Sequence, residues 1–200
     1  KKAFLTGDVI ADALAAARQL SLKRADRVAG VPAGEFYVAT IHRADTTDDL
    51  SILREVIQAL ATLSLPVVLP AHPRLRRKLD ACSDLLSRSR ISIIEPLGYI
   101  DMVSLVGTAR AVFTDSGGLQ KEAVWLGVPC VTLRDETEWS ETLQDGYNQL
   151  VGQAYERILE AEKRIPAIRA LQLPPQGAAS RLCVEIIISK LKGRISGKIP

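Results

Sequence analysis

The chain has 200 residues, 47% of them hydrophobic, so it can bury a core within one large domain or two small ones. Its net charge of +3 comes from interspersed acids and bases, and only 4% of its residues are aromatic, which disfavours a nucleic-acid-binding protein. Three widely spaced cysteines and the lack of a bilayer-length apolar run disfavour a disulfide scaffold and a membrane protein, and they indicate a reducing cytoplasm.

Short apolar segments alternate with segments of helical periodicity along the chain. The expected strands cover residues 35–41, 66–70, 91–94, 111–113, 130–133 and 148–151. The expected helices cover residues 9–20, 50–63, 74–78, 99–107, 119–126, 139–143, 153–163 and 178–192, with Thr46, Thr47 and Asp48 as caps for the second. This alternation predicts an α/β fold with a doubly wound parallel sheet. The strands lack hydrophobic alternation, which agrees with burial on both faces.

Polar and turn-forming residues follow each of the first five expected strands. They are His42 and Arg43, His72, Pro96 to Gly98, Ser116 to Gly118, and Arg134 to Glu138, in chain order. The carboxyl ends of parallel strands meet at one edge of a sheet, which is where α/β folds bind ligands. We therefore expect these five turns to converge on a single binding rim.

The functional interpretation depends on residues 112–123, which read as a strand, an Asp-Ser-Gly-Gly turn and a helix. In this arrangement the free N–H groups at the start of the helix point at an anion. Gly117 and Gly118 would let a phosphate approach the backbone, and Ser116 would cap the helix or donate to a phosphate oxygen. Glu122 lies at the edge of the apolar stripe and needs a partner such as ribose hydroxyls. Alternatively, the serine is only an N-cap and the glutamate reaches solvent.

Each rim residue also has a purely structural interpretation. His42 and His72 are either structural hydrogen-bonding groups or residues that contact a phosphate or move a proton. A zinc site is disfavoured because no third ligand has suitable spacing. The Arg74–Lys78 cluster is expected to be a solvated helix face, and residues 134–138 form either an acidic loop or one that aims Arg134 at a diphosphate. A hydrolase triad is disfavoured because the pattern G-x-S-x-G is absent.

Several of these motifs occur together in one order along residues 37–151. They are residues 40–44 (TIHRA), 70–74 (PAHPR), 95–99 (EPLGY), 114–123 (TDSGGLQKEA), 126–129 (LGVP), 134–139 (RDETEW) and 148–152 (NQLVG). This ordered set resembles the C-terminal half of the non-hydrolysing UDP-N-acetylglucosamine 2-epimerases. Residues 7–14 (GDVIADAL) are similar to the crossover that joins the two domains of that family.

The resemblance implies two Rossmann-like domains facing a cleft, the GT-B architecture, with UDP held by the C-terminal domain. By position, Ser116 would bind the diphosphate together with the two glycines, Glu122 the ribose, and the Pro96–Tyr99 loop would lie near uracil. The implied UDP-binding residues are His42, Arg43, His72, Pro96, Leu97, Tyr99, Ser116, Gly117, Gly118, Glu122, Arg134 and Glu138. His42 is also expected to be catalytic.

The activity that the resemblance implies is inversion at C2 of the sugar. It interconverts UDP-GlcNAc and UDP-ManNAc through elimination of UDP to a glycal and its re-addition, and it serves cell-envelope polysaccharide synthesis. The scheme needs no cofactor and no metal, but it needs a stabilised diphosphate, a base at C2 and acid/base carboxylates. The expected partner is UDP or a UDP-N-acetylhexosamine, with no nucleic acid and no membrane. A homodimer is the expected assembly if the domain face that meets the other half self-associates.

The chain departs from the family at two points. The family reads His-Arg-x-Glu-Asn where this chain reads His42-Arg43-Ala44-Asp45-Thr46, and the family's main carboxylates lie in its N-terminal domain. The resemblance of residues 7–14 implies that residues 1–21 are a crossover from another domain, and the start at Lys1 without an initiating methionine leads us to expect that this domain is missing from the chain. Residues 22–192 would be the UDP-binding domain and residues 193–200 a frayed tail.

We expect this chain to bind UDP without efficient epimerisation, because acid/base assistance alone contributes about 10²–10⁴-fold. Two other functions remain open from the residues. One is the corresponding half of a UDP-sugar glycosyltransferase of GT-B architecture, and the other is a non-catalytic UDP-binding module.

Overall fold

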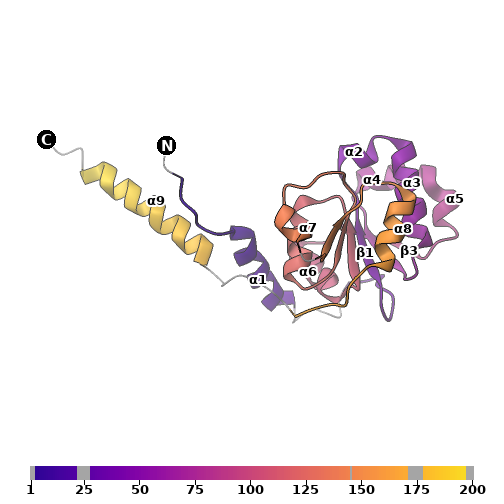
Figure 1. Ribbon diagram of the computed structural model, residues 1–200, viewed down its shortest axis with the longest axis horizontal. Helices are drawn as coiled ribbons and strands as arrows, with labels where there is room; N and C mark the ends of the chain where they lie inside the picture. Colours follow the sequence, from indigo (N-terminus) through magenta and orange to yellow (C-terminus); the bar gives the residue numbers. More distant parts are fainter. Residues whose placement is uncertain (1–2, 22–27, 145, 171–177, 197–200) are drawn as a thin grey trace.

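The computed structural model describes residues 3–21, 28–144, 146–170 and 178–196 (Figure 1). Six strands in this part of the chain form one sheet. They are β1 (Tyr37–Thr40), β2 (Val67–Pro70), β3 (Ile91–Ile94), β4 (Ala111–Thr114), β5 (Cys130–Thr132) and β6 (Asn148–Leu150). The longer helices are α1 (Val9–Ser21), α3 (Leu50–Thr62), α4 (Pro73–Leu79), α6 (Tyr99–Thr108), α7 (Gly117–Trp125), α8 (Tyr155–Lys163) and α9 (Ala178–Ser196). Short helical turns are α2 (Ala44–Thr47), η1 (Asp80–Cys82), α5 (Ser83–Leu86) and η2 (Ser140–Leu143).

The sheet is parallel throughout and has the strand order β3-β2-β1-β4-β5-β6. Along the chain, β2 and β3 are therefore added on one side of β1, and β4, β5 and β6 are then added on its other side. Thr40 at the end of β1 is in register with Thr114 at the end of β4. The crevice beyond the carboxyl ends of these two strands is the switch point at which doubly wound sheets bind ligands. The predicted doubly wound fold is confirmed.

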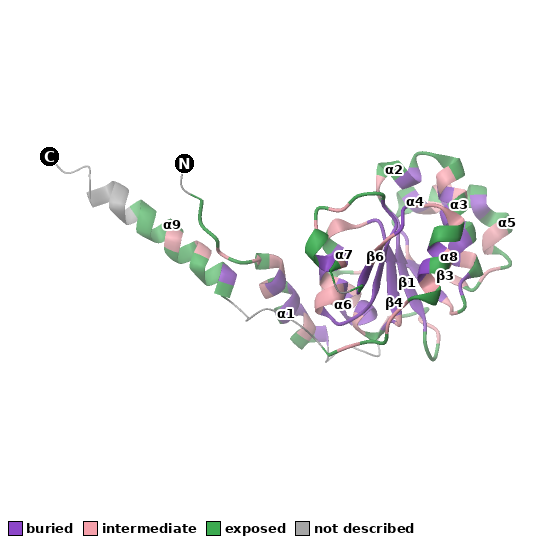
Figure 2. Ribbon diagram, viewed as in Figure 1, coloured by how far each residue is buried: buried purple, intermediate pink, exposed green. Residues whose placement is uncertain are grey.

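Helices cover both faces of the sheet because successive strand side chains point to opposite sides. Tyr37 and Phe113 face one core, where their rings contact edge to face with centroids 5.2 Å apart and α3 and α8 cover them. Val38 and Val112 face the other core, which α1, α6 and α7 cover. Figure 2 shows the strands as buried between these two layers. Both cores hold the strand ends, and hence the switch point, in fixed positions.

Helix α9 lies at one end of the long axis of the molecule, and α1 lies between α9 and the sheet (Figure 1). Leu14 of α1 is fully buried in the core with α6, so the expected crossover segment shares its core with the sheet domain. Helix α9 packs on α1, where Asp12 accepts hydrogen bonds from Ser180 N at 2.8 Å and Ser180 Oγ at 2.6 Å. Helix α9 continues to Ser196, beyond the expected end at residue 192, and residues 197–200 of the expected frayed tail lie outside the described residues.

Three local expectations differ from the structure. The N-cap of α3 is Asp49, whose Oδ1 accepts from Ser51 N at 2.8 Å, because the threonines expected as caps belong to α2. The basic cluster on α4 is only partly solvated, since Arg74 and Lys78 both pair with Asp48. The helix expected over residues 139–143 is a 3₁₀ turn. No helix in the described segments combines the length and apolarity needed to cross a bilayer.

Candidate functional site

The turn after β4 is held at the switch point by hydroxyl groups. Thr40 Oγ1 and Thr114 Oγ1 lie 2.6 Å apart across the two central strands, and Thr114 Oγ1 also accepts from Ser116 N at 2.9 Å. Ser116 then caps α7, because its Oγ accepts from Leu119 N at 3.4 Å. The first amides of a helix have no carbonyl partner within it, so the start of α7 presents N–H groups and a positive dipole end. The predicted strand–turn–helix unit is confirmed.

The two glycines of this turn have different surroundings. A Cβ added at Gly118 would meet no protein atom within 4 Å, so this position faces open space. A Cβ added at Gly117 would lie 3.3 Å from Trp139 Nε1 and 3.5 Å from Glu138 Oε2. The space beside Gly117 is therefore filled by the loop after β5. Of the two glycines expected to admit a phosphate, only Gly118 opens outward, and Gly117 lets the loop pack against the helix.

Asp115 joins the turns that follow the two central strands. Its side chain is fully buried, and its Oδ2 accepts from His42 N at 3.0 Å and from Arg43 N at 2.9 Å. Its Oδ1 lies 3.2 Å from Nδ1 of His42, whose side chain is 55% exposed. An ionised carboxylate only accepts hydrogen bonds, so the buried Asp115 holds the two backbone N–H groups of the turn after β1 in place.

Eight of the twelve residues expected to bind UDP line one hollow of about 440 Å³. They are His42, His72, Pro96, Leu97, Tyr99, Ser116, Gly118 and Glu122. Thr40, Ile41, Pro70, Met102 and Leu119 complete its lining. The lining comes from the turns after β1, β2, β3 and β4 and from α6 and α7, so the predicted convergence of these turns is confirmed.

Glu122 projects from α7 into the hollow beside the loop after β3. The hydroxyl of Tyr99 donates to Glu122 Oε1 at 2.8 Å. Burial raises the pKa of Glu122, while the hydrogen bond from Tyr99 lowers it. Burial also raises the pKa of Tyr99 above its ordinary range, and the nearby carboxylate adds to this effect. Among the described residues, Tyr99 is the hydrogen-bond donor to this carboxylate, which has further acceptor capacity for donors in the hollow.

Arg134 and Glu138 lie next to Gly117, and Arg43 is near enough to Glu138 to lower the pKa of its carboxylate. The guanidinium of Arg134 donates to both carboxylate oxygens of Glu138, each at 2.9 Å, and the Arg134 side chain is only 8% exposed. These hydrogen bonds lower the pKa of Glu138 to about 2. The pair is a preformed bidentate contact of the kind that arginine also makes with a phosphate. The loop after β5 therefore brings a guanidinium that is already paired with Glu138 to the edge of the Ser116 turn.

The model of the family described as UDP-N-acetylglucosamine 2-epimerase matches residues 1–181. The chain belongs to this family.

Individual relatives agree with the family match. A "UDP-N-acetylglucosamine 2-epimerase homolog" of Methanococcus maripaludis is 39% identical over 163 residues, covering 78% of this chain and 46% of the relative. The "UDP-2,3-diacetamido-2,3-dideoxy-D-glucuronate 2-epimerase" of Pseudomonas aeruginosa is 44% identical over 131 residues, covering 64% of this chain and 36% of the relative. The solved Methanocaldococcus jannaschii UDP-GlcNAc 2-epimerase, in complex with UDP-GlcNAc and UDP, superposes with a TM-score of 0.83 at 30% identity.

The chain spans about half the length of the relatives that it matches. The superposition on the Methanocaldococcus jannaschii epimerase covers 93% of this chain and 54% of that one. This coverage agrees with the expected place of the domain as one half of a two-domain GT-B architecture.

The departure of this family member from the His-Arg-x-Glu-Asn pattern lies in helix α2. Asp45 is exposed and pairs with Arg43 at 3.3 Å. Thr46 is buried, and its Oγ1 accepts from Gln153 Nε2 at 2.9 Å. The two changed positions therefore support the turn that carries His42 and Arg43, and neither lines the hollow.

His72 has a structural contact as well as a place in the hollow of this epimerase-family domain. It is the N-cap of α4, and its Nδ1 accepts from Arg74 N at 3.3 Å. The structural and functional interpretations of this residue are thus compatible, because the cap occupies one ring nitrogen and leaves the other edge of the ring for the hollow.

Asp115 contacts two predicted site residues, although the sequence interpretation gives it no binding role. It lies inside the recognised turn, but its partners His42 and Arg43 are 73 and 72 residues away in the chain. Met102 and Pro70 are also unpredicted lining residues, and they belong to a helix and a strand that read as ordinary apolar segments. A polar residue directly after a buried strand is the only sequence signal for Asp115.

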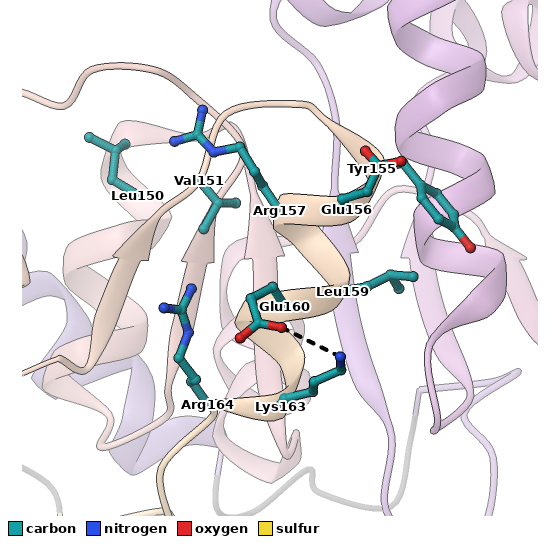
Figure 3. A pocket seen from close by; sticks show the side chains of 9 residues that line it. All are labelled: Leu150, Val151, Tyr155, Glu156, Arg157, Leu159, Glu160, Lys163 and Arg164. Carbon is teal, nitrogen blue, oxygen red and sulfur yellow. Dashed lines mark ion pairs between the residues drawn. The ribbon is translucent and has the colours of Figure 1, made fainter.

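A second hollow of about 570 Å³ lies along α8, away from the turns of the UDP motifs. Figure 3 shows the side chains that line it, projecting from α8 and from the end of β6, with Glu160 and Lys163 joined by an ion pair of 3.4 Å. Its charged side chains alternate in sign along one exposed helix, which is the ordinary pattern of a solvated face. Of the residues that line it, Leu150 and Val151 fall within a family motif, at residues 148–152, and those on α8 do not.

Proposed function

We propose that the 440 Å³ hollow binds the UDP moiety of a UDP-2-acetamido sugar, and that the chain is the UDP-binding half of a UDP-N-acetylglucosamine 2-epimerase. The observation that carries this proposal is the convergence of the α7 N-terminus, Gly118 and Glu122 on one hollow at the switch point. The family membership and the bound UDP-GlcNAc and UDP of the Methanocaldococcus jannaschii relative support it.

In the proposed complex each part of UDP has its own chemistry. The free amides of α7 and the hydroxyl of Ser116 donate to the diphosphate, and Arg134 supplies positive charge. The carboxylate of Glu122 accepts from the ribose hydroxyls, and the loop from Pro96 to Tyr99 contacts uracil. During elimination, the same preorganised donors stabilise the departing diphosphate without reorganising. The main acid/base carboxylates of the family scheme are expected in the other half of the enzyme.

A second candidate substrate is a UDP-2,3-diacetamido uronate. The Pseudomonas aeruginosa relative with this substrate in its name is 44% identical to this chain. Both candidates share UDP and an acetamido group at C2, so the proposed binding of the nucleotide is the same. Testing epimerisation of both sugars by the full-length gene product distinguishes them.

The nucleotide site is tested by calorimetry with UDP and uridine on this chain. Ser116→Ala should weaken UDP binding roughly tenfold and leave uridine binding unchanged, because it removes a hydrogen bond to a charged group. Glu122→Ala should weaken both ligands, because the ribose is common to them. Ser87→Ala and Glu156→Ala, on exposed surfaces outside the hollow, are the matched controls. Equal affinity of the unmodified chain for uridine and UDP would contradict the proposed diphosphate site.

The reaction is tested by proton exchange at C2 of UDP-GlcNAc in heavy water, using the full-length gene product. Exchange without transfer of the sugar to an acceptor supports the epimerase. Sugar transfer supports the glycosyltransferase, and UDP binding with neither reaction supports the non-catalytic module.

We also propose a homodimer and a cytoplasmic location for this protein. The dimer is supported by exposed apolar side chains on α9, such as Ile187 and Leu191, which are 58% and 53% exposed. The location is supported by the free thiols of Cys82, Cys130 and Cys183, which suit a reducing compartment.

A further inference from the structure

Lys121 of α7 is a buried charged residue to which the proposed UDP site gives no role. Its side chain is only 3% exposed. A lysine is almost never buried to this extent unless its ammonium is paired. Two kinds of partner surround Nζ of Lys121, namely a carboxylate next to α1 and the rings of two tryptophans. The ammonium therefore joins parts of the chain that are far apart in the sequence.

The carboxylate partner is Asp8, which lies directly before α1. Its Oδ1 accepts from Ile10 N at 2.9 Å and thereby caps the helix, and its Oδ2 accepts from Nζ of Lys121. Burial raises the pKa of Asp8, but the hydrogen bonds from Lys121 and Ile10 N bring it below its ordinary value. The carboxylate is therefore ionised at neutral pH and neutralises the buried ammonium.

The aromatic partners of Lys121 are Trp139 in the loop after β5 and Trp125 on α7. Nζ lies 3.5 Å from the centroid of the Trp139 ring and 5.3 Å from that of Trp125. Both distances are within the range of about 6 Å in which a ring face attracts a cation, and this attraction is stronger away from water. Because Trp125 belongs to the same helix as Lys121, the contact with Trp139 is the one that ties the loop to α7.

Trp139 carries this contact to the start of α7. A Cβ added at Gly117 would lie 3.3 Å from Nε1 of Trp139. The same position is 3.5 Å from Glu138 Oε2 and 3.8 Å from Arg134 Nη1. The indole therefore packs where the ion pair of this loop meets the first turn of the helix.

The loop has a second, uncharged contact with α7. Thr137 Oγ1 donates to Oε1 of the fully buried Gln120 at 2.7 Å and accepts from Trp139 N at 3.1 Å. This contact fixes the backbone of the loop, whereas Lys121 contacts the indole. Loss of the lysine should therefore free the indole and the adjacent ion pair without unfolding the loop.

We propose that Lys121 is a positioning residue of the UDP site, because its ammonium holds Trp139, and with it the loop after β5, against the first turn of α7. This inference rests on the proposed function, in which the diphosphate binds at that turn. Asp8 contributes by neutralising the ammonium. Since Asp8 belongs to the expected crossover segment, the site is held in part by a residue outside the hollow.

Two simpler roles of Lys121 lead to different outcomes. If the lysine only joins α1 to α7, its loss should lower the stability and leave ligand binding unchanged. If it only adds positive potential to the site, removal of the Asp8 carboxylate should strengthen UDP binding. A positioning role predicts that loss of either residue weakens UDP binding. Uridine binding should not change, because uridine has no diphosphate.

The contact is measured in the unliganded chain by NMR of the lysine side chains, with Lys121→Met to assign the resonance. The ε-methylene of Lys121 lies next to Nζ at the Trp139 ring, so the ring current should shift its resonance upfield of the other lysines. Trp139→Leu should remove this shift, and Trp125→Leu should leave most of it. A Lys121 resonance at the ordinary position would overturn the inference without any use of UDP.

Calorimetry with UDP and uridine tests the role in binding. Lys121→Met keeps the length of the side chain but removes its charge, and it should weaken UDP binding roughly three- to tenfold with uridine binding unchanged. Lys121→Arg keeps a cation that stacks on an indole, so it should restore most of the affinity. Lys163→Met, at an exposed side chain of α8, is the matched control. An unchanged ratio of UDP to uridine affinity in folded Lys121→Met contradicts the proposal.

Asp8→Ser separates positioning from simple charge. Serine keeps a cap for α1 but is too short to pair with Lys121, so UDP binding should weaken as it does in Lys121→Met. Stronger UDP binding by this variant would show that only the charge matters and would exclude the positioning role. Should Lys121→Met not fold, Asp8→Ser decides the question by the same comparison of UDP with uridine.

The double variant Lys121→Met with Trp139→Leu tests whether the lysine acts through the indole. It should bind UDP no more weakly than the weaker of the two single variants, because both remove the same contact. Additive losses would mean that Lys121 acts by another route. An unmodified chain that binds UDP and uridine equally overturns the proposed function and the binding role of Lys121 together. A preference for UDP that is the same in every variant overturns only this inference.

Discussion

Single residues of the proposed binding site oppose folding, and Glu122 is the clearest case. It is held in the hollow with one partner, the Tyr99 hydroxyl at 2.8 Å, and burial raises its pKa. A group whose pKa is higher in the folded state opposes folding when it is ionised. Perturbed carboxylates of this kind concentrate at functional sites.

Glu122→Gln should raise the free energy of unfolding at pH 7, because the neutral amide keeps the shape and the contact with Tyr99 but removes the buried charge. The penalty of the carboxylate sets in as pH rises from its ordinary pKa of 4.5 to its higher folded-state pKa. The difference between variant and unmodified chain should therefore vanish below about pH 4, as urea denaturation at pH 4 and pH 7 would measure. A variant less stable than the unmodified chain at pH 7 would contradict this.

Glu138→Gln is the control of opposite sign. The hydrogen bonds from Arg134 lower the pKa of Glu138 to about 2, so this carboxylate stabilises the fold above its ordinary pKa of 4.5. That contribution is lost as pH falls from 4.5 toward 2. Glu138→Gln should therefore lower the free energy of unfolding at pH 7, whereas Glu122→Gln should raise it in the same measurement.

The sequence predicts that helix α1 is a crossover between domains, and the structure also places it in the core of this domain. Residues 7–14 resemble a crossover between domains, yet Leu14 is fully buried against α6 and Val38 in the second core. Asp8, at the start of the helix, also pairs with the buried Lys121 of α7. Helix α1 therefore also covers one face of the sheet.

Leu14→Ala should lower the free energy of unfolding by about 2–5 kcal/mol, because it removes buried methyl groups and leaves a cavity. Leu5→Ala is the matched control: this side chain is 97% exposed, so its truncation should change the stability by less than about 0.5 kcal/mol. Urea denaturation of both variants measures the difference. Equal, small effects would mean that α1 is not part of the domain core.

The whole molecule combines a compact sheet domain with a helix that stands outside it. Helix α9 is apolar around much of its circumference, with exposed Leu182, Val184, Ile187, Ile188 and Leu191. A helix that is apolar on most sides is normally covered by another surface. The proposed homodimer would cover it with the α9 of a second copy.

The double variant Ile187→Lys with Leu191→Lys should shift the protein from dimer to monomer in light scattering after size-exclusion chromatography, because the added charges oppose burial of this surface. Glu185→Lys is the control, since it adds positive charge on the same helix without removing apolar area. An unmodified chain that is monomeric at all concentrations would contradict the proposed homodimer.

Local patterns in the sequence were enough to locate the strands, the helix that starts at Gly117 and the turns that surround the hollow. Such features depend on the periodicity of burial and on turn chemistry within a few residues. The contact of Asp115 with His42, the packing of Trp139 beside Gly117 and the burial of Leu14 depend instead on β4 lying beside β1 and on which helix covers which face. These contacts join residues that are far apart in the chain, so they exist only once the order of the strands is established.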